Sequence, residues 1–353
     1  MSRPLRLGVD AANVLVDRRG IGRYARSLLQ RFADLPERVE LTLLMPQLFP
    51  NFLARRLADV IGRRNFRVAR RAAASRLNLD VVWYPWNGMT WIAQGPKAAT
   101  VHDVWPFVSP SVDPKIRRNE QTPFRNTAEH ANLILADSQF IRSEIISMFG
   151  VAPDTLVVVP LGVDPRRESE TADAALPDGV TRYVLFVGEA EPRKDLGTLV
   201  NAMSKLDEPL RNEVALVVAG RRAHWRNFGH PAGVRTLVLG AVEEVRLAAL
   251  YRGAAAFVFP STYEGFGLPV LEAMAYGAPV VASSAASIPE AGGDAALYFP
   301  TGDATALATQ LTRVLTDAEL AQRLRFAGQA RAATMTWDRC AEQTLSVLER
   351  FKT

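Results

Sequence analysis

The segment from Phe257 to Val281 (FVFPSTYEGFGLPVLEAMAYGAPVV) constrains the fold of this chain more than any other part of the sequence. The apolar run Ala254–Pro260 lacks the alternation of a half-exposed strand, which is typical of a parallel strand covered on both faces. A helix is predicted over Pro269–Tyr276, because proline is tolerated in a first turn and Gly277 follows as a stop. The next strand begins at Val280. This order predicts an α/β domain with a parallel sheet.

The turn between that strand and that helix is suited to hold an anion. Its backbone N–H groups lie at the positive end of the helix dipole. Two carboxylates, Glu264 and Glu272, flank the turn eight positions apart. A hydroxyl-rich ligand offsets the cost of placing acids beside an anion, because it donates hydrogen bonds to them. The segment predicts a site for a phosphate joined to sugars, and the alternative is an ordinary turn with solvated glutamates. The turn residues are Gly265, Phe266, Gly267 and Leu268.

Length and composition are those of a globular chain with two domains or one large one. The sequence has 353 residues, of which 48% are hydrophobic and 22% charged. It lacks the run of about 18 apolar residues that reads as a membrane-spanning helix. The start, MSRPLRLGVD, lacks the apolar region of a signal peptide. One cysteine, Cys340, excludes internal disulfides, and four scattered histidines form no metal-binding pair. We therefore expect a cytoplasmic protein without a metal site.

The net charge of +5 is concentrated in the first half of the chain. Residues 1–165 carry 22 Lys and Arg against 15 Asp and Glu, and the remainder carries 20 against 22. The densest basic part is Asn51–Leu77, where eight arginines face one acid, Asp59, with apolar residues between them. This pattern is typical of a basic amphipathic segment on an anionic membrane surface, and a solvated arginine-rich helix is the alternative. Nucleic acid is not expected, because no recognisable nucleic-acid module accompanies the arginines.

The first half has a glycine-rich loop after its first predicted strand, Leu5–Val9. In the sequence GIGRY, Gly20 and Gly22 let the backbone pass close to a ligand or another strand. The third glycine of a dinucleotide fingerprint is missing, so NAD is not indicated. A tight turn ahead of a packing helix is the alternative interpretation of Gly22.

A histidine follows the predicted strand Ala98–Val101. His102 and Asp103 come at the carboxyl end of this strand, where open α/β sheets bind ligands. A histidine there can donate to a substrate hydroxyl or move a proton. A histidine satisfied within the structure is the alternative, and Asp103 is interpreted as a turn or capping group.

Other elements of the first half are predicted from apolar runs and caps. A helix is expected over Gln139–Phe149, between an N-cap at Ser138 and a stop at Gly150. A polar, breaker-rich stretch near residues 162–178 predicts the domain boundary. The remaining strands are expected over Val39–Met45, Val81–Tyr84, Leu133–Ala136 and Val157–Pro160.

The second half begins with a predicted strand over Tyr183–Val187, followed by two adjacent cations, Arg193 and Lys194. Cations at a βα turn suit a diphosphate, because they stabilise the charge that grows on a leaving group. Two solvated cations are the alternative. Further strands are expected over Val214–Gly220 and Val234–Leu239, and helices from about Asp303 to Leu315, from Asp317, and from about Trp337 to Phe351.

The string GFGLPVLEAMAYGAPVVAS, with Glu264 before it and Glu272 within it, resembles the Glu-x7-Glu motif of retaining GT-B glycosyltransferases of the group 1, family 4 type. The resemblance implies an α/β fold of two doubly wound Rossmann-like domains that face each other across a cleft. Residues 1–165 would be the N-terminal acceptor-binding domain and residues 175–335 the nucleotide-sugar-binding domain. Residues 336–353 would be a helix crossing back to the first domain.

The resemblance also implies roles at the donor site. Arg193, Lys194 and the amides of residues 265–268 would hold the diphosphate without a metal ion. Glu272 would take the ribose hydroxyls, and Glu264 the hydroxyls of the donor sugar near the reacting carbon. One position departs from the family, because Glu189 stands where many relatives have an arginine. This departure leaves open which cation acts.

Three further positions inherit a role from the resemblance. His102 would reach the donor sugar, Gly22 the donor phosphates or the acceptor, and Val242 the nucleotide base through its backbone. A backbone contact leaves the choice between UDP and GDP open.

The implied activity is metal-independent transfer of a hexose from a nucleotide sugar, with retention of configuration and front-side attack. The EPRK and GIGRY strings resemble those of bacterial mannosyltransferases of surface polysaccharide synthesis, which favours mannose. A glycan or lipid-linked acceptor would account for the basic segment and would place the protein at the inner face of the cell membrane. A GT-B-like epimerase or phosphorylase and a non-catalytic nucleotide-sugar sensor are the alternatives.

Overall fold

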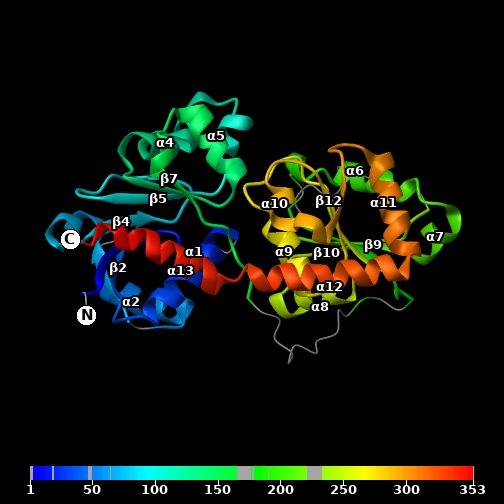
Figure 1. Ribbon diagram of the computed structural model, residues 1–353, viewed down its shortest axis with the longest axis horizontal. Coiled ribbons are helices and arrows are strands. Elements are labelled where there is room, and N and C mark those ends of the chain that lie inside the picture. Colours follow the sequence, from blue (N-terminus) through cyan, green and yellow to red (C-terminus); the bar gives the residue numbers. More distant parts are fainter. Residues whose placement is uncertain are drawn as a thin grey trace. The chain divides into compact units, whose positions relative to one another are not determined.

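The computed structural model of the chain describes residues 3–17, 20–46, 50–63, 65–164, 176, 179–189, 191–220 and 233–352. The chain divides into two compact units, which are residues 1–161 with 337–353, and residues 162–336. Figure 1 shows that each unit is a sheet packed with helices. The stretch 162–178, where the sequence predicts a boundary, lies largely outside the described residues.

The first unit contains a seven-stranded parallel sheet in the order β3-β2-β1-β4-β5-β6-β7. The order reverses between β1 and β4, as in doubly wound folds. The strands are β1 (Leu5–Asp10), β2 (Val39–Met45), β3 (Arg67–Arg70), β4 (Val81–Tyr84), β5 (Lys97–Val101), β6 (Leu133–Ala136) and β7 (Leu156–Val158). The helices are α1 (Gly20–Ala33), α2 (Pro50–Ile61), α3 (Trp105–Val108), α4 (Pro114–His130), α5 (Gln139–Phe149) and α13 (Trp337–Leu348), with 3-10 turns η1 (Arg71–Arg76), η2 (Pro153–Thr155) and η6 (Glu349–Phe351).

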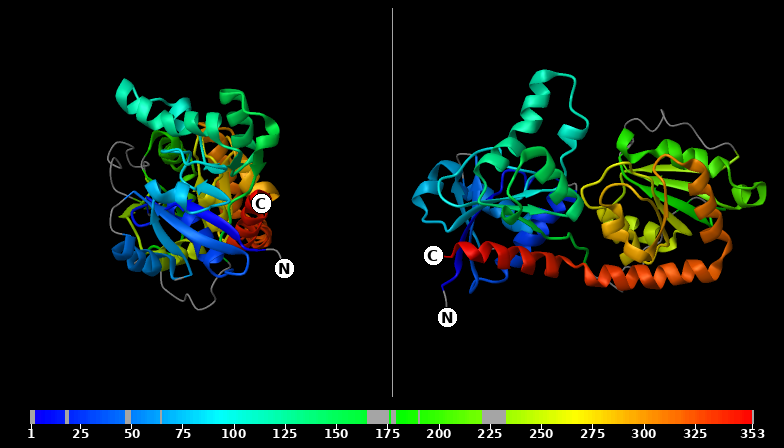
Figure 2. Two further views of the ribbon diagram at one scale, coloured as in Figure 1. Left: turned by 90° about the vertical axis from the view of Figure 1, so that its left-hand side faces the viewer. Right: turned by 45° about the horizontal axis from the view of Figure 1, so that its top comes forward.

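The last helix, α13, belongs to the first unit, where it packs against α1. Figure 2 (right) shows α13 in red along the blue elements of this unit. Trp337 is buried and its ring lies 6.3 Å from that of Tyr24. Arg38 adds surface ion pairs to Glu342, at 2.7 Å, and to Glu349, at 3.1 Å. Buried aromatic contact therefore holds the helix, since exposed ion pairs contribute at most about 1 kcal/mol each.

The second unit contains a six-stranded parallel sheet in the order β10-β9-β8-β11-β12-β13. The order reverses between β8 and β11, which lie next to each other at the centre of the sheet. The strands are β8 (Tyr183–Val187), β9 (Ala215–Ala219), β10 (Thr236–Gly240), β11 (Ala256–Phe259), β12 (Val280–Ser283) and β13 (Ala296–Phe299). The helices are α6 (Leu196–Ser204), α7 (Glu208–Glu213), α8 (Glu244–Gly253), α9 (Leu268–Ala275), α10 (Ile288–Gly292), α11 (Ala304–Thr316) and α12 (Ala318–Thr334), with 3-10 turns η3 (Pro192–Lys194) and η5 (Gly293–Ala295).

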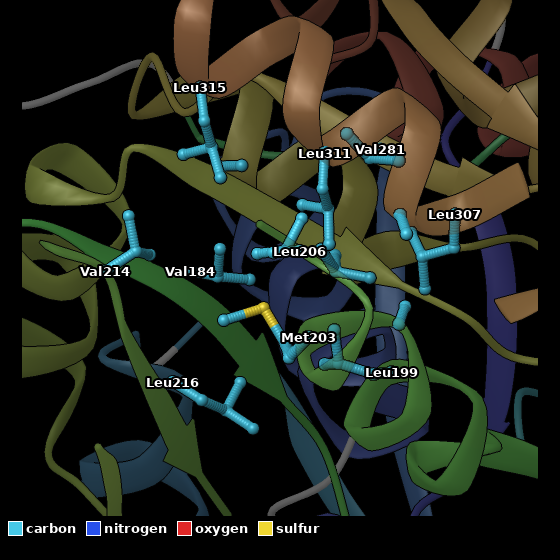
Figure 3. Close-up of a cluster of buried hydrophobic side chains, with 14 of the residues drawn as sticks. Val184, Leu199, Met203, Leu206, Val214, Leu216, Val281, Leu307, Leu311 and Leu315 are labelled. Carbon is cyan, nitrogen blue, oxygen red and sulfur yellow. The ribbon is translucent and has the colours of Figure 1, made fainter. Parts of the chain in front are cut away.

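The core on one face of this sheet is built from aliphatic side chains of strands and helices. Figure 3 shows Leu199 and Met203 of α6 beside Leu307 and Leu311 of α11, together with strand residues such as Val184. All five side chains are buried. The apolar runs of the strands thus lie against the apolar stripes of covering helices, as expected for a parallel sheet.

The predicted elements are largely confirmed. The strands over Val39–Met45, Val81–Tyr84 and Tyr183–Val187 and the helix over Gln139–Phe149 have the predicted bounds. Several bounds differ from the prediction, and two of these differences concern candidate site residues. α1 already begins at Gly20, so that Gly22 lies in a helix and not in a loop, and α9 begins and ends one residue earlier than predicted.

The arginine-rich segment Asn51–Leu77 forms several elements and not one amphipathic helix. In α2 the apolar residues Leu53, Leu57 and Ile61 are buried in the first unit, whereas Arg55 and Arg56 are exposed. The apolar side of α2 therefore serves the protein core, and the exposed side is charged. None of the described helices combines the length and hydrophobicity needed to cross a membrane.

The cap of α5 provides a test of the local structure. Ser138 accepts a hydrogen bond from the amide of Ile141 at 3.1 Å and is buried. We expect Ser138→Ala to lower the free energy of unfolding by about 1 kcal/mol, because a buried amide loses its acceptor. Urea unfolding followed by circular dichroism measures the change. Ser143→Ala in the same helix is the matched control, since Ser143 is exposed and caps nothing. Equal effects of the two substitutions would contradict the capping role.

Candidate functional site

The candidate site of the second unit lies at the carboxyl ends of its two central strands. β8 and β11 pair in parallel, so the segments that follow them leave the same edge of the sheet. Arg193 and Lys194 follow β8, and Glu264 follows β11. Since the strand order reverses between these strands, the site occupies the position where open α/β sheets bind ligands.

The centre of this site is a buried carboxylate held by two cations. Lys194 Nζ lies 2.5 Å from Glu264 Oε1, and Arg193 Nη1 lies 3.1 Å from Oε2. Glu264 is only 8% exposed and Lys194 9%. Burial by itself would raise the pKa of Glu264, but the charges of Lys194 and Arg193 outweigh it and lower that pKa below its ordinary value. The three side chains thus form one ionised cluster.

The backbone joins the two loops that carry this cluster. The amide of Thr262, beside Glu264, donates to the carbonyl of Arg193 at 2.7 Å. Ser287 Oγ donates to the carbonyl of Glu264 at 2.8 Å. Lys194 Nζ also lies 5.2 Å from the ring centre of Phe259, at the end of β11. The positions of the charges are therefore set by hydrogen bonds and packing as well as by attraction.

The sequence reasoning missed one acid of this cluster. Glu191 Oε2 accepts from Arg193 Nε at 2.8 Å, so Arg193 contacts two carboxylates. Its place in the EPRK string, two residues before the arginine, could have indicated it. Glu189, at the position of the family arginine, has its carbonyl bonded to the amide of Glu191 at 2.9 Å. This bond is made by the backbone of Glu189 and not by its side chain.

The predicted anion turn precedes α9, as the sequence indicates. Gly267 has φ of +105°, a conformation that side chains rarely adopt, and its carbonyl accepts from Val270. Leu268 begins the helix, Phe266 is buried and Gly265 is half-buried. The first amides of a helix have no carbonyl partner within it, and Leu268 supplies such an amide here. α9 can thus hold an anion at its amino end.

Glu272 lies one turn into α9 and is half-buried. Its Oε2 accepts from the hydroxyl of Tyr251 at 3.3 Å. Tyr251 is another partner that the sequence analysis did not identify. It lies in α8, and no spacing along the chain links it to Glu272. This hydrogen bond from the tyrosine orients the carboxylate of Glu272.

The second candidate group is His102, at the carboxyl end of β5 in the first unit. The side chain is 5% exposed, and both ring nitrogens have partners. Nδ1 lies 2.7 Å from Asp137 Oδ2, and Nε2 lies 3.1 Å from the carbonyl of Pro85. The ring of Tyr24 packs edge-on against it at 4.8 Å. His102 is thus held in one orientation, and Nε2 must donate because a carbonyl only accepts.

The sequence analysis did not identify Asp137, although this residue, like His102, directly follows a strand at the carboxyl edge of the sheet. It follows β6, the strand beside β5, at the same edge of the sheet. The two residues share one proton between Nδ1 and Oδ2. Burial lowers the pKa of His102, but the charge of Asp137 and their hydrogen bond outweigh it, so that this pKa is raised above its ordinary value. Burial in turn raises the pKa of Asp137.

The remaining predicted residues are placed as follows. Gly22 in α1 has no space for a side chain, because a Cβ atom would lie 2.0 Å from the carbonyl oxygen of Asp17. Close packing against the backbone of Asp17 therefore explains why a glycine stands at this position. Val242 lies between β10 and α8 and is half-buried. A ligand role for either residue stays a prediction. The described residues contain no group of three or more His, Cys, Asp and Glu arranged to hold a metal ion.

The His102–Asp137 pair predicts a pH dependence. We expect Asp137→Asn to lower the pKa of His102, because the amide removes the negative charge that stabilises the imidazolium. In the wild type the pKa of His102 is higher in the folded than in the unfolded protein. Protonated His102 therefore stabilises the fold at a pH below its unfolded pKa, and this stabilisation is lost as the pH rises through its folded pKa. The variant should lose that dependence. NMR titration of the four histidine Cε1 protons, with His102→Gln for assignment, measures the shift.

The other ionisable groups near this pair define the control. They are Asp103, Tyr24 of α1 and Cys340 of α13. Asp103 makes no hydrogen bond to the ring and has only a small influence on its charge, so Asp103→Asn should lower the pKa of His102 less than Asp137→Asn does. An unchanged His102 titration in Asp137→Asn would refute the pairing.

Comparison with known proteins identifies the family. The model of the glycosyl transferases group 1 matches residues 169–331, and that of glycosyltransferase family 4 matches residues 18–167. The chain is 31% identical over 363 aligned residues to the O-antigen chain mannosyltransferase B of Escherichia coli, covering 93% of this chain and 95% of that protein.

Solved structures of similar fold cover the whole chain. The sucrose-phosphate synthase of Thermosynechococcus elongatus has a TM-score of 0.73 at 18% identity and covers 98% of both chains. The Anabaena protein HepE, in complex with UDP and glucose, has a TM-score of 0.72 at 16% identity, over 99% of this chain and 100% of its own. Two Rossmann-like units with parallel sheets are the GT-B fold. Because the two family models together match most of its residues, this chain belongs to the group 1 and family 4 glycosyltransferases.

Proposed function

We propose that this glycosyltransferase moves a mannosyl group from a nucleoside diphosphate sugar to a glycan or lipid-linked acceptor in bacterial surface polysaccharide synthesis. Support for mannose comes from the relative named O-antigen chain mannosyltransferase B, which aligns along nearly its full length. The observation that carries the proposal is the ionised cluster of Glu264, Lys194 and Arg193 beside the amino end of α9.

This cluster combines the two functions that the reaction needs. The diphosphate is held by Arg193, Lys194 and the amides before α9, which stabilise the charge that develops as the glycosidic bond breaks. Glu264 accepts hydrogen bonds from the donor sugar, and it already lies against both cations. The cations thus connect the phosphate end of the donor with the sugar end. Glu272, oriented by Tyr251, binds the ribose hydroxyls.

The chemical step proceeds with retention of configuration by front-side attack. The bond between the anomeric carbon and the diphosphate oxygen breaks, and the acceptor oxygen bonds to the same face of that carbon. The departing phosphate takes the acceptor proton, so no protein nucleophile is required. Glu264, whose pKa is lowered, is ionised at neutral pH and stabilises the positive charge of an oxocarbenium-like transition state.

His102 is the acceptor-domain residue assigned to the donor sugar. Its Nε2 proton is engaged with the carbonyl of Pro85, so contact with a sugar hydroxyl requires that bond to be shared or exchanged. Asp137 supplies the charge that keeps the ring fixed while this happens.

GDP-mannose is the proposed donor, and UDP-glucose is the necessary comparison because the HepE structure is a complex with UDP and glucose. The base would be met by the backbone near Val242, after β10. A panel of nucleoside diphosphates in a thermal-shift assay distinguishes the two bases.

Substitution of Glu264 is the main test of the proposed mechanism. Glu264→Gln keeps the shape but removes the charge, so we expect kcat to fall about 100-fold or more with a mannose-terminated lipid-linked oligosaccharide as acceptor. Glu272→Gln should mainly raise the KM for GDP-mannose, because it contacts the ribose. GDP release and product mass are measured with and without acceptor, and the anomeric proton coupling reports the configuration.

The control is Glu319→Gln, an exposed glutamate of α12 in the same unit, which should leave turnover unchanged. Thermal unfolding checks that Glu264→Gln is folded. The assigned roles are wrong if Glu264→Gln stays within a few-fold of wild type while Glu272→Ala abolishes activity. Binding of GDP-mannose without any turnover would identify a sensor, and conversion of the donor sugar without acceptor an epimerase.

The exposed basic side of α2 generates a second prediction. We propose that it attracts the protein to the inner face of the cell membrane as a peripheral protein. Because Leu53, Leu57 and Ile61 are buried, the attraction must be electrostatic. Flotation with vesicles rich in phosphatidylglycerol should exceed that with phosphatidylcholine and fall with salt.

The double variant Arg55→Gln, Arg56→Gln should reduce this binding several-fold, since each cation near such a surface contributes about 1 kcal/mol. Arg323→Gln with Arg313→Gln, two exposed arginines of the second unit, is the control of equal charge. Equal flotation with neutral and anionic vesicles would remove the membrane proposal.

A further inference from the structure

The second unit contains a cavity of about 640 Å³ away from the candidate site. Arg182 precedes β8, Ala255 precedes β11 and Gly277 precedes β12, and all three line the cavity together with α12. Because these strands are parallel, the cavity lies at their amino ends. The cluster around Glu264 lies at the carboxyl ends. The cavity is therefore separate from the proposed donor site, at the opposite end of α9.

The cavity is basic. Arg182, Arg252 and Arg325 line it, and its lining includes neither Asp nor Glu among the described residues. Arg182 pairs with Glu213 at 2.5 Å, which balances one of the three charges. Within the described part of the chain no carboxylate pairs with Arg252 or Arg325. These two positive charges thus have no acidic partner among the residues described, and an anion would offset the cost of placing them at one cavity.

For Arg325 the cost of burying a positive charge is visible in its pKa. It is half-buried, and burial lowers its pKa below the ordinary value. Nη1 donates to the carbonyl of Gly277 at 2.5 Å and Nη2 to that of Ala254 at 3.0 Å. A guanidinium has five N–H groups, so these two bonds, which join α12 to the segments before β11 and β12, leave donors for a ligand.

The rest of the wall is mainly apolar and aromatic, with the polar residues Thr316, Gln322 and Gln329 among the lining. Phe326 of α12 is 63% exposed at the cavity, and Val314 and Leu315 of α11 also line it. The guanidinium carbon of Arg252 lies 5.8 Å from the ring centre of Tyr276. A volume of this size, mostly apolar with a few convergent polar groups, is typical of a small-molecule site. An exposed phenylalanine beside cations fits a ligand with an anionic and an apolar part.

We propose that this cavity is a second ligand site, which binds a phosphate or carboxylate group carried on an apolar or aromatic body. Arg252 and Arg325 take the anion, and Phe326 and Tyr276 contact the apolar body. Tyr276 also connects the cavity with the donor site, since its ring stacks on Tyr251, whose hydroxyl donates to Glu272.

Ligand-observed NMR with phenyl phosphate and the full-length protein tests the site. GDP at saturation occupies the donor site, so that remaining binding reports on the cavity. We expect binding at millimolar concentration or below, and we expect Arg252→Gln to weaken it about 10-fold. Phe326→Ser should weaken phenyl phosphate but leave inorganic phosphate nearly unchanged. The control is Arg323→Gln, an exposed arginine of α12 that does not line the cavity, which should bind as wild type.

A variant of the donor site separates this proposal from the proposed function. Lys194→Met, whose folding is verified by thermal unfolding because it breaks the buried pair with Glu264, should lose GDP binding but keep phenyl phosphate binding, whatever the transferase activity proves to be. The proposal is overturned if GDP displaces phenyl phosphate completely, if Arg252→Gln binds as well as Arg323→Gln, or if phenyl phosphate shows no binding up to about 10 mM. Thermal unfolding verifies that Arg252→Gln is folded. Among the described residues Arg252 forms no ion pair and lies near the ring of Tyr276, so we expect the fold to persist.

Discussion

The buried ion pair between Glu264 and Lys194 is the interaction on which the second unit's site depends. Arg193 completes it, so one carboxylate holds two loops that follow neighbouring strands. Breaking a buried pair by removing one partner costs about 3–5 kcal/mol, because the other charge stays buried without compensation. The geometry that places cations beside α9 is therefore part of the stability of the fold.

The same pairing gives the site its chemical character. An ionised carboxylate between two cations is a group that a sugar can hydrogen-bond to and a phosphate can approach, whereas an isolated buried glutamate would take up a proton. The first unit uses a similar arrangement with His102 and Asp137, again on neighbouring parallel strands. In both units, polar groups that could not be buried alone are buried as a pair at the carboxyl edge of a sheet.

Sequence reasoning located the elements and the strand-end residues because these depend on local patterns. Apolar runs marked the strands, and the caps at Ser138 and Gly150 marked α5. It missed Asp137, Tyr251 and Glu191, which act as partners. Two of these come from distant segments, and their contacts depend on which strands and helices become neighbours. The strand β3 was also missed, because its residues lie half-exposed at the sheet edge and show no apolar run.

The sequence by itself determined two α/β halves, the glycine-containing turn before α9 and the acids and cations that follow the strands, because periodicity, glycine and proline act over a few residues. Only the tertiary structure decided that Lys194 and Arg193 share Glu264, that His102 is closed off by Asp137 and Pro85, and that the apolar side of α2 is buried. Each of these depends on segments that the sheet order brings together. Contacts between charges are set by distance in space, which spacing along a chain does not contain.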